Sequence, residues 1–223
     1  MGSYVANVVV TDGTMTSGAA SVTITAAQVH DTGVTASQCY GSGSNTLVSC
    51  TGSAALALNS VQDGMLGRDV SSADNADGKL GFSFSAVGSY ASTECVKDNL
   101  TGLIWEGKPT AGDRASSNSY SNYGDGRSAD ASSYVTTVNA AKLCGYSNWR
   151  LPTRAELQAL LDYSVASPGP GVDTTWFPNT AAASYWSSSA YLGSTAKAWY
   201  VSFANGTVSS DTRSVKLPLR LVR

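Results

Sequence analysis

Charged side chains are scarce in this chain of 223 residues. Asp, Glu, Lys and Arg make up 13% of it, roughly half the share usual in soluble domains. The net charge is −2 and no basic block occurs, so the positive patch of a nucleic-acid-binding protein is missing. No apolar run approaches the ~20 residues of a membrane-spanning helix. Histidine occurs once, as His30, and there is no Cys-x-x-Cys pair, so we predict no metal site and no cofactor.

A signal peptide is also missing, because the chain opens directly on a strand-like run at residues 4–10. We expect any export signal to lie upstream. Glycine, serine, threonine, alanine and asparagine take the place of charge, which favours short strands and long ordered loops. Such a composition is common in secreted and cell-surface proteins.

The four cysteines are Cys39, Cys50, Cys95 and Cys144. Their even number fits two disulfides in any of three pairings. The alternative is four buried free thiols in a cytosolic protein. Disulfides agree better with the composition and predict an extracellular or cell-surface location.

Three segments are predicted along the chain. Residues 1–27 contain a hairpin that resembles the last two strands of an immunoglobulin-like surface repeat of the polycystic-kidney-disease type. Two strands cannot bury a core, so we expect the hairpin to pack on the main domain or on a neighbouring chain. Residues 28–38 are predicted to be a linker, and residues 39–223 the main domain.

Two helices are predicted in the main domain. Residues 130–144 place Val135, Val138 and Ala141 on one face, and Gly145 follows as a C-cap. Residues 153–163 begin with a capping box and carry three leucines at helical spacing. The box is formed by Thr153 and Glu156, and the leucines are Leu157, Leu160 and Leu161.

The C-terminal third is predicted to be β, which makes the fold class α+β. Strands are expected at residues 185–188 and 198–203, with a weaker one at 81–84, and Asn205-Gly206 predicts a hairpin turn. A last strand alternates leucines, and Pro218 places it at an edge or bulge. Its leucines are Leu217, Leu219 and Leu221.

Alternation along residues 198–204 predicts two faces of one strand. The face expected to be buried carries Trp199, Val201 and Phe203, and the face expected to be exposed carries Tyr200, Ser202 and Ala204. Thr207, Ser209, Asp211 and Tyr191 are expected to share that exposed face. Four tryptophans lie among apolar residues and are predicted to be structural. They are Trp105, Trp149, Trp186 and Trp199.

Several blocks of sequence, in order across about 95–223, resemble the Lcl C-terminal domain family. The main ones are DNLTGLIWE at 98–106, LCGYSNWRLPT at 143–153, WFPNT at 176–180, YWSS at 185–188, AWYV at 198–201 and RLVR at 220–223. The resemblance implies a C-type-lectin-like fold, related to formylglycine-generating enzymes and to the variable proteins of diversity-generating retroelements. Members of the family belong to bacterial, archaeal and phage surface proteins and adhesins.

The family motifs also bear on chemistry and on the disulfides. Cys95 and Cys144 each lie beside a motif, and Cys39 to Cys50 closes a short polar loop, so we predict the pairs Cys95–Cys144 and Cys39–Cys50. The enzymatic relatives use a reactive cysteine pair in a C-terminal site. This chain has no cysteine after Cys144, so that activity is not carried over and we predict no enzyme.

In the retroelement-diversified relatives, adenine mutagenesis of AAC codons yields NNC codons in the C-terminal segment. NNC codons do not encode Lys, Glu, Gln, Met or Trp, and no such residue occurs at the positions that we expect to contact ligand within about 187–217. These positions are Ala190, Tyr191, Gly193, Ser194, Tyr200, Ser202, Ala204, Thr207, Ser209, Ser210, Asp211, Thr212, Ser214 and Val215. Tyr, Ser and Gly there resemble an antibody paratope. The predicted partner is an unknown protein or glycan on a cell or phage surface.

Other chemistry is less well supported by the residues. The carboxylates of Asp98, Glu106, Asp162 and Asp173 are scattered and are expected to serve in caps and turns. Residues 74–78 partly resemble a calcium loop, but both terminal ligand positions fail, so a structural calcium ion is only an alternative to the prediction of no cofactor. Two alternatives remain beside the binding module: a structural or assembly domain of a surface or phage protein without diversification, and, last, an enzyme.

Overall fold

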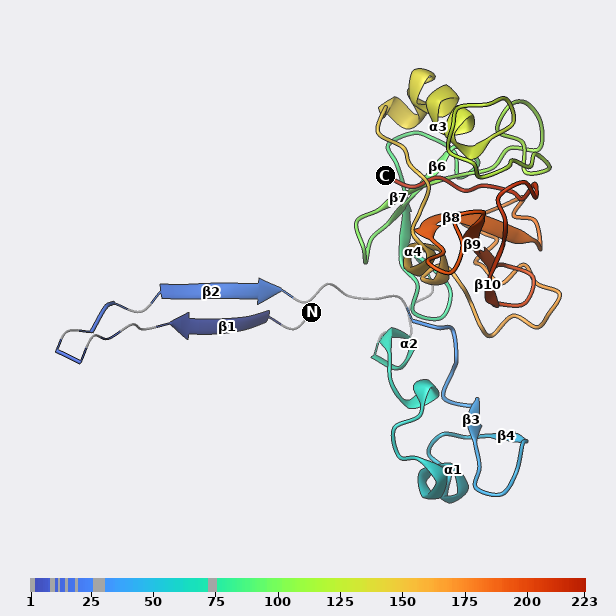
Figure 1. The fold of residues 1–223 in the computed structure, drawn as a ribbon. Coiled ribbons are helices and arrows are strands. Elements are labelled where there is room, and N and C mark those ends of the chain that lie inside the picture. Colours follow the sequence, from blue (N-terminus) through green and yellow to red (C-terminus); the bar gives the residue numbers. More distant parts are fainter. Residues whose placement is uncertain are drawn as a thin grey trace.

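The computed structural model describes residues 3–8, 11, 13–14, 16–18, 20–25, 31–71 and 76–223. Short helices and antiparallel sheets make up its regular structure, so the chain is α+β as its sequence predicts. Figure 1 shows an N-terminal hairpin, a small lobe of residues 39–71 and a main body of residues 76–223. Within these residues, none of the helices combines the length and hydropathy needed to cross a membrane.

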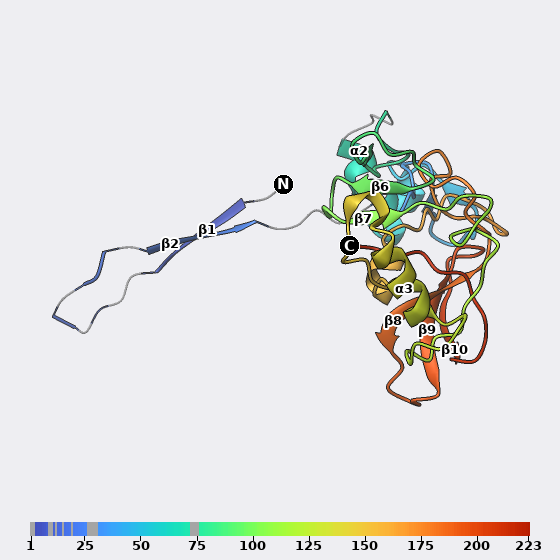
Figure 2. The ribbon, with the colours of Figure 1, turned by 90° about the horizontal axis from the view of Figure 1, so that it is seen from above.

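The hairpin consists of β1 (Ser3–Val8) and β2 (Ala20–Thr25), paired antiparallel. It stands apart from the rest of the chain in both views (Figures 1 and 2), so the expected packing on the main domain is not seen. Its origin in an immunoglobulin-like domain stays a prediction. The first three residues of the expected linker, 28–30, lie outside the described residues, and His30 is one of them. Residues 31–33 pack on the body, where the Tyr163 amide donates to the Thr32 carbonyl at 2.8 Å.

The small lobe has little core of its own. Its elements are β3 (Cys39–Tyr40), β4 (Leu47–Val48), α1 (Ser53–Leu58), the 3-10 turn η1 (Asp63–Met65) and α2 (Arg68–Ser71). Only Cys39, Cys50 and Ala55 form a buried cluster, and the Cys39–Cys50 disulfide joins two of them. The Gln62 side chain completes the lobe by bonding the amide and the carbonyl of Tyr40, at 2.8 and 2.9 Å.

The first sheet of the main body has the order β5-β6-β7, with β5 (Phe84–Ala86), β6 (Cys95–Asp98) and β7 (Ile104–Glu106). The strand expected at 81–84 therefore starts only at Phe84. Gly81 has a φ of +87°, and a Cβ there would lie 2.7 Å from the Asp31 side chain. Only glycine suits this turn, because its φ is positive and Asp31 leaves no room for a side chain.

Helix α3 (Ala131–Ala140) is shorter than the predicted 130–144. Lys142 adopts a left-handed conformation, and the Asn139 side chain bonds both backbone groups of Trp149, so the chain turns away. A 3-10 turn, η2 (Leu143–Gly145), follows and brings Cys144 to its disulfide with Cys95. The helix buries Ala131, Tyr134 and Val138, whereas the expected Ala141 is exposed.

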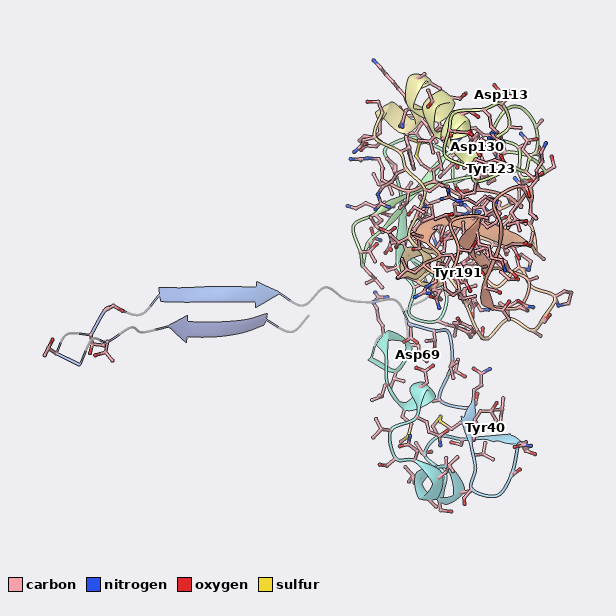
Figure 3. The ribbon with its side chains drawn as sticks, viewed as in Figure 1. Tyr40, Asp69, Asp113, Tyr123, Asp130 and Tyr191 are labelled. Carbon is pink, nitrogen blue, oxygen red and sulfur yellow. A yellow bond between two sulfur atoms is a disulfide. The ribbon has the colours of Figure 1, made fainter. Side chains whose placement is uncertain are left out.

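Asp130 caps the start of α3. Burial alone would raise the pKa of its carboxyl, but hydrogen bonds from Ser132, Ser121 and the Tyr123 amide lower it to about 2. Asp130 is therefore ionised at neutral pH and stabilises both the helix start and the preceding loop. Asp130 and Tyr123 of this loop are labelled close together in Figure 3.

Helix α4 (Arg154–Gln158) has the predicted capping box of Thr153 and Glu156. It ends five residues before the predicted Tyr163, because tertiary hydrogen bonds replace the helical ones. The Asp162 amide, for example, donates to the Gly171 carbonyl at 2.9 Å. The three predicted leucines are all buried: Leu157, Leu160 and Leu161.

The second sheet has the order β10-β9-β8, with β8 (Ser184–Ala190), β9 (Lys197–Ser202) and β10 (Val208–Thr212). The predicted turn joins β9 to β10, with Gly206 at φ +72°. Residues 217–222 are not the predicted last strand. They make single bridges to three separate segments and bury four consecutive side chains, which an alternating edge strand does not do. These are Leu219, Arg220, Leu221 and Val222.

This second sheet is covered on both faces. One core cluster contains Tyr185, Val201 and Phe203, together with Trp105 and the leucines of the α4 region. The other contains Trp186 and Ala198, with Tyr200 packed against it, and includes the buried residues of α3. Three of the tryptophans predicted to be structural lie in these clusters: Trp105, Trp149 and Trp186.

A charged group lies buried between the first sheet, α3 and the C-terminal segment. The Glu106 carboxylate, 0% exposed, accepts hydrogen bonds from Lys108 Nζ at 2.9 Å, from the Tyr134 hydroxyl and from the Leu221 amide at 3.0 Å. Burial lowers the pKa of Lys108 to about 8, against the attraction of Glu106. Removing one partner of such a pair leaves an uncompensated charge in the interior.

Arg220 extends this network. Its guanidinium, also 0% exposed, donates to the Glu106 carbonyl and to Thr180 Oγ1, each at 2.6 Å, and lies 4.8 Å from the centre of the Phe177 ring. The C-terminal segment is thereby fixed to β7 and to the loop before β8.

We expect the Lys108→Met variant to lose about 3–5 kcal/mol of unfolding free energy, because the Glu106 charge stays buried without its cation. Urea unfolding at neutral pH measures this. The matched control is Arg127→Ala, which removes the exposed pair of Arg127 with Asp125 and should leave the midpoint unchanged. Equal stability of the two variants would show that the buried pair adds nothing.

Candidate functional site

The register of the second sheet decides which predicted ligand contacts lie together. Opposite residues of antiparallel strands share a face, and Ser209 lies opposite Tyr200 while Ser210 lies opposite Trp199. Tyr200 and Ser209 therefore share a face, as the sequence predicts. Tyr191, expected beside them, instead contacts Trp199 on the other face, with ring centres 5.2 Å apart.

The prediction that Tyr200, Ser202 and Ala204 lie on an exposed face is wrong for Ser202, which is buried. Tyr200 and Ala204 are partly exposed. The Tyr200 ring packs edge-on against Trp186 at 6.3 Å. The physical reason is that α3 and the C-terminal segment cover this face, so polarity along the strand does not separate inside from outside.

The fourteen predicted contact positions therefore differ in exposure. Ser202 is buried. The exposed ones are Ala190, Gly193, Thr207, Ser209, Thr212 and Ser214. The partly exposed ones are Tyr191, Ser194, Tyr200, Ala204, Ser210, Asp211 and Val215.

Trp199 lies at the surface, which corrects its predicted place in the core. It is partly exposed and lies between Tyr191 and the Arg154 guanidinium, whose carbon is 4.8 Å from the ring centre. The Lys197 ammonium lies 5.9 Å from the centre of the Tyr191 ring. We call these four residues, Tyr191, Trp199, Arg154 and Lys197, the Trp199 cluster.

Local structure brings the Trp199 cluster together. A register shift between Trp186 and Ala190 bends the end of β8, and Ser189 Oγ accepts the Arg154 amide at 2.9 Å. The first residue of α4 is thus fixed to the end of β8. In Figure 3 the label of Tyr191 lies beside α4, and Figure 2 shows the β8–β9 connection projecting from the body.

The Trp199 cluster is positively charged and has an apolar neighbour. Among the described residues no ion pair involves Arg154 or Lys197, and Glu156 of the same helix is paired with Arg150 at 2.7 Å. Leu192, next to Tyr191, is 98% exposed. Exposed aromatic, arginine and leucine side chains at one point of the surface are available to a partner.

The sequence did not single out Arg154, Lys197 and Leu192. Arg154 is 45 residues from Trp199 along the chain, and only the folded contact joins them. The one local signal is Leu192, an apolar residue between Tyr191 and Gly193 in a segment of turn-forming residues.

The remaining candidate sites lie elsewhere. Burial raises the pKa of Asp69 to about 6, together with its hydrogen bond to Asp31 and the charge of that neighbour, and Figure 3 shows Asp69 in the small lobe. Of the partial calcium loop, residues 74 and 75 lie outside the described residues, and the Asp77 carboxylate bonds Ser83. In the described ranges no group of three His, Cys, Asp or Glu side chains is arranged to hold a metal ion.

Comparison with known protein families gives one match. Residues 94–223 match the Lcl C-terminal domain. The match covers β6 to β10 with α3 and α4, and so includes the Trp199 cluster and the buried Glu106 network. None of the curated proteins compared with the chain matches it.

The two tryptophans of the second sheet should respond differently to truncation. Trp186→Ala should cost roughly 3–5 kcal/mol, because the side chain is fully buried and its Nε1 bonds the Tyr120 carbonyl at 2.9 Å. Trp199→Ala should cost about 1 kcal/mol, as for a partly exposed side chain. Denaturant unfolding of both variants measures the difference, and equal costs would place Trp199 in the core after all.

Proposed function

The chain belongs to the Lcl C-terminal domain family, and on that premise we propose that it is a non-catalytic binding module displayed outside the cell. We further propose that its matched domain has a C-type-lectin-like fold. The ligand-contacting surface would be the Trp199 cluster with the exposed ends of β8, β9 and β10.

The Trp199 cluster is the observation that carries this proposal. Tryptophan, tyrosine and arginine are the side chains most enriched at binding hot spots, and here Trp199 contacts the edge-on ring of Tyr191 and the Arg154 guanidinium at the surface. The contacts hold Trp199 and Arg154 in place before a partner arrives, which reduces the entropy lost on binding. Leu192 adds an apolar contact at the tip of the projecting connection.

Diversification is the finer part of the proposal. The exposed predicted positions surround the Trp199 cluster or follow the turn after β9, and surface substitutions there cost little stability. Trp199 and Lys197 cannot be encoded by NNC codons, so they would remain constant while neighbours such as Tyr191 and Ser210 vary. The buried Ser202 would tolerate only small side chains.

The absence of catalysis is supported by the cysteines. All four are held in the two disulfides, Cys39–Cys50 and Cys95–Cys144, in the pairing that the sequence predicts. No thiol remains for the chemistry of the enzymatic relatives. Disulfides persist in oxidising surroundings, which supports display on a cell or virion.

The second candidate is a structural or assembly domain, in which the same surface meets another copy of the chain. The exposed Leu192 favours it, since an apolar tip beside Tyr191 and Trp199 also suits a fixed contact between subunits. Light scattering over a range of concentrations separates the two candidates, because an assembly domain associates with itself without any added partner.

We expect the double variant Tyr191→Ser, Leu192→Ser to weaken binding of a surface partner at least about tenfold, since tyrosine is a hot-spot type and Leu192 is a fully accessible apolar side chain beside it. The partner is first captured from host-surface extract by the wild type and identified, and its affinity is then measured with each variant. The matched control is Tyr123→Ser, which removes a similar tyrosine stacked on Arg127 at 3.7 Å but outside the surface. Unchanged affinity of the double variant, with an unchanged melting temperature, would contradict the proposed surface.

The gene itself tests diversification. We expect the codons of the exposed predicted positions to end in C, and a near-repeat of the segment to lie close to a reverse transcriptase gene. The codons of the buried core positions of β9, such as Val201 and Phe203, serve as the internal comparison because no such bias is expected there. A gene without the repeat leaves the undiversified adhesin or assembly domain as the function.

A further inference from the structure

A pocket lies near the opposite end of β9 from the Trp199 cluster. It is a pocket of about 480 Å³, within the range of small-ligand sites. The Gly171 amide beside it donates to the Phe203 carbonyl at 2.8 Å. Phe203 follows Trp199 by four residues, or about 13 Å of extended chain, so the pocket is separate from the Trp199 cluster.

Four consecutive residues form one wall of the pocket: Asp173, Thr174, Thr175 and Trp176. Asp173 is 9% exposed, and its carboxylate accepts the Thr175 amide at 2.9 Å and the Lys79 amide at 3.0 Å. These two bonds fix the wall and join it to the Lys79 segment on the other side of the pocket. A carboxylate accepts more than two hydrogen bonds, so Asp173 keeps acceptor capacity.

Trp176 gives the pocket an aromatic surface. Its ring is partly exposed and packs at 6.3 Å against Phe84 of the core, which holds it in position. Within the described part of the chain, its indole N–H makes no hydrogen bond, and neither does the hydroxyl of Thr174 or Thr175. Both threonines are exposed. The pocket therefore combines an aromatic face with neutral donors and acceptors that the protein does not use itself.

The positive charge that lines the pocket is already paired within the protein. The Lys79 ammonium lies 3.2 Å from the buried Asp162 carboxylate, and Asp173 is held by backbone amides. A strongly anionic ligand would find no unpaired cation, because Lys79 is paired with Asp162, whereas hydroxyl groups would find free donors and the remaining acceptor capacity of Asp173. A ring with an apolar C–H face and several hydroxyls meets both requirements.

We infer that this pocket binds a neutral pyranose sugar, with the ring against Trp176 and its hydroxyls bonded to Asp173, Thr174 and Thr175. The inference does not rest on the Trp199 cluster. A surface module with this pocket would hold a sugar unit of a glycan at one end of β9 and a second contact at the other.

The test uses the whole chain and three neutral methyl glycosides: α-mannopyranoside, α-glucopyranoside and β-galactopyranoside. Saturation-transfer NMR should show binding of at least one of them, with a dissociation constant of about 1 mM, as for a small solvent-exposed ligand. Trp176→Ala should weaken that binding at least about tenfold. The control Tyr123→Ala, which truncates an exposed aromatic outside the pocket, should leave it unchanged.

Thr175→Val provides a second variant if Trp176→Ala fails to fold, since an exposed hydroxyl is exchanged for a methyl group of the same shape. It should keep the melting temperature and weaken glycoside binding severalfold. The inference is overturned if none of the glycosides binds, if Thr175→Val and any folded Trp176→Ala bind as well as wild type, or if glycine betaine binds and the glycosides do not. Loss of glycoside binding in Trp176→Ala with retained partner binding would separate this pocket from the proposed surface.

Discussion

The buried Glu106 carboxylate is the interaction on which the rest of the main body depends. It accepts hydrogen bonds from Lys108, Tyr134 and the Leu221 amide, and so joins β7, α3 and the C-terminal segment. That segment in turn supports the second sheet, because the Pro218 carbonyl accepts the Trp186 amide. A buried charge is costly unless every partner is in place. The strands that carry the candidate surface are therefore connected through the chain end to the first sheet and α3.

Coverage of the second sheet on both faces decides where a ligand can touch it. Val201 and Phe203 face one core cluster, and Ala198 and Tyr200 the other. Neither face is free along its centre, so contact is left to the strand ends, the β8–β9 connection and the turn after β9. Cores resist changes of side-chain volume, whereas connections tolerate them. The positions best suited to variation are thus the exposed ones, and not the polar residues of the strand centre.

The sequence predicts what short-range chemistry determines. The capping box of Thr153 and Glu156, the turn at Gly206 and the burial of Leu157 are all present. The sequence pattern is less informative where contacts between distant segments determine the local structure. Helix α3 ends early because Asn139 bonds Trp149 and Cys144 must reach Cys95. The Glu106 network joins residues more than a hundred positions apart, as the 114-residue separation of Arg220 from Glu106 shows, and no periodicity signals it.

Trp199 shows how the same limit affects the candidate site. Alternation with Val201 and Phe203 correctly puts it on their side of β9, but burial declines toward the strand end, where the core stops and α4 begins. There the ring is covered by Tyr191 and Arg154 instead of by core side chains. A large aromatic at such a boundary is held by its neighbours and yet stays partly exposed. Those two properties are what a binding anchor requires, and they arise here because the sheet extends beyond the core that supports it.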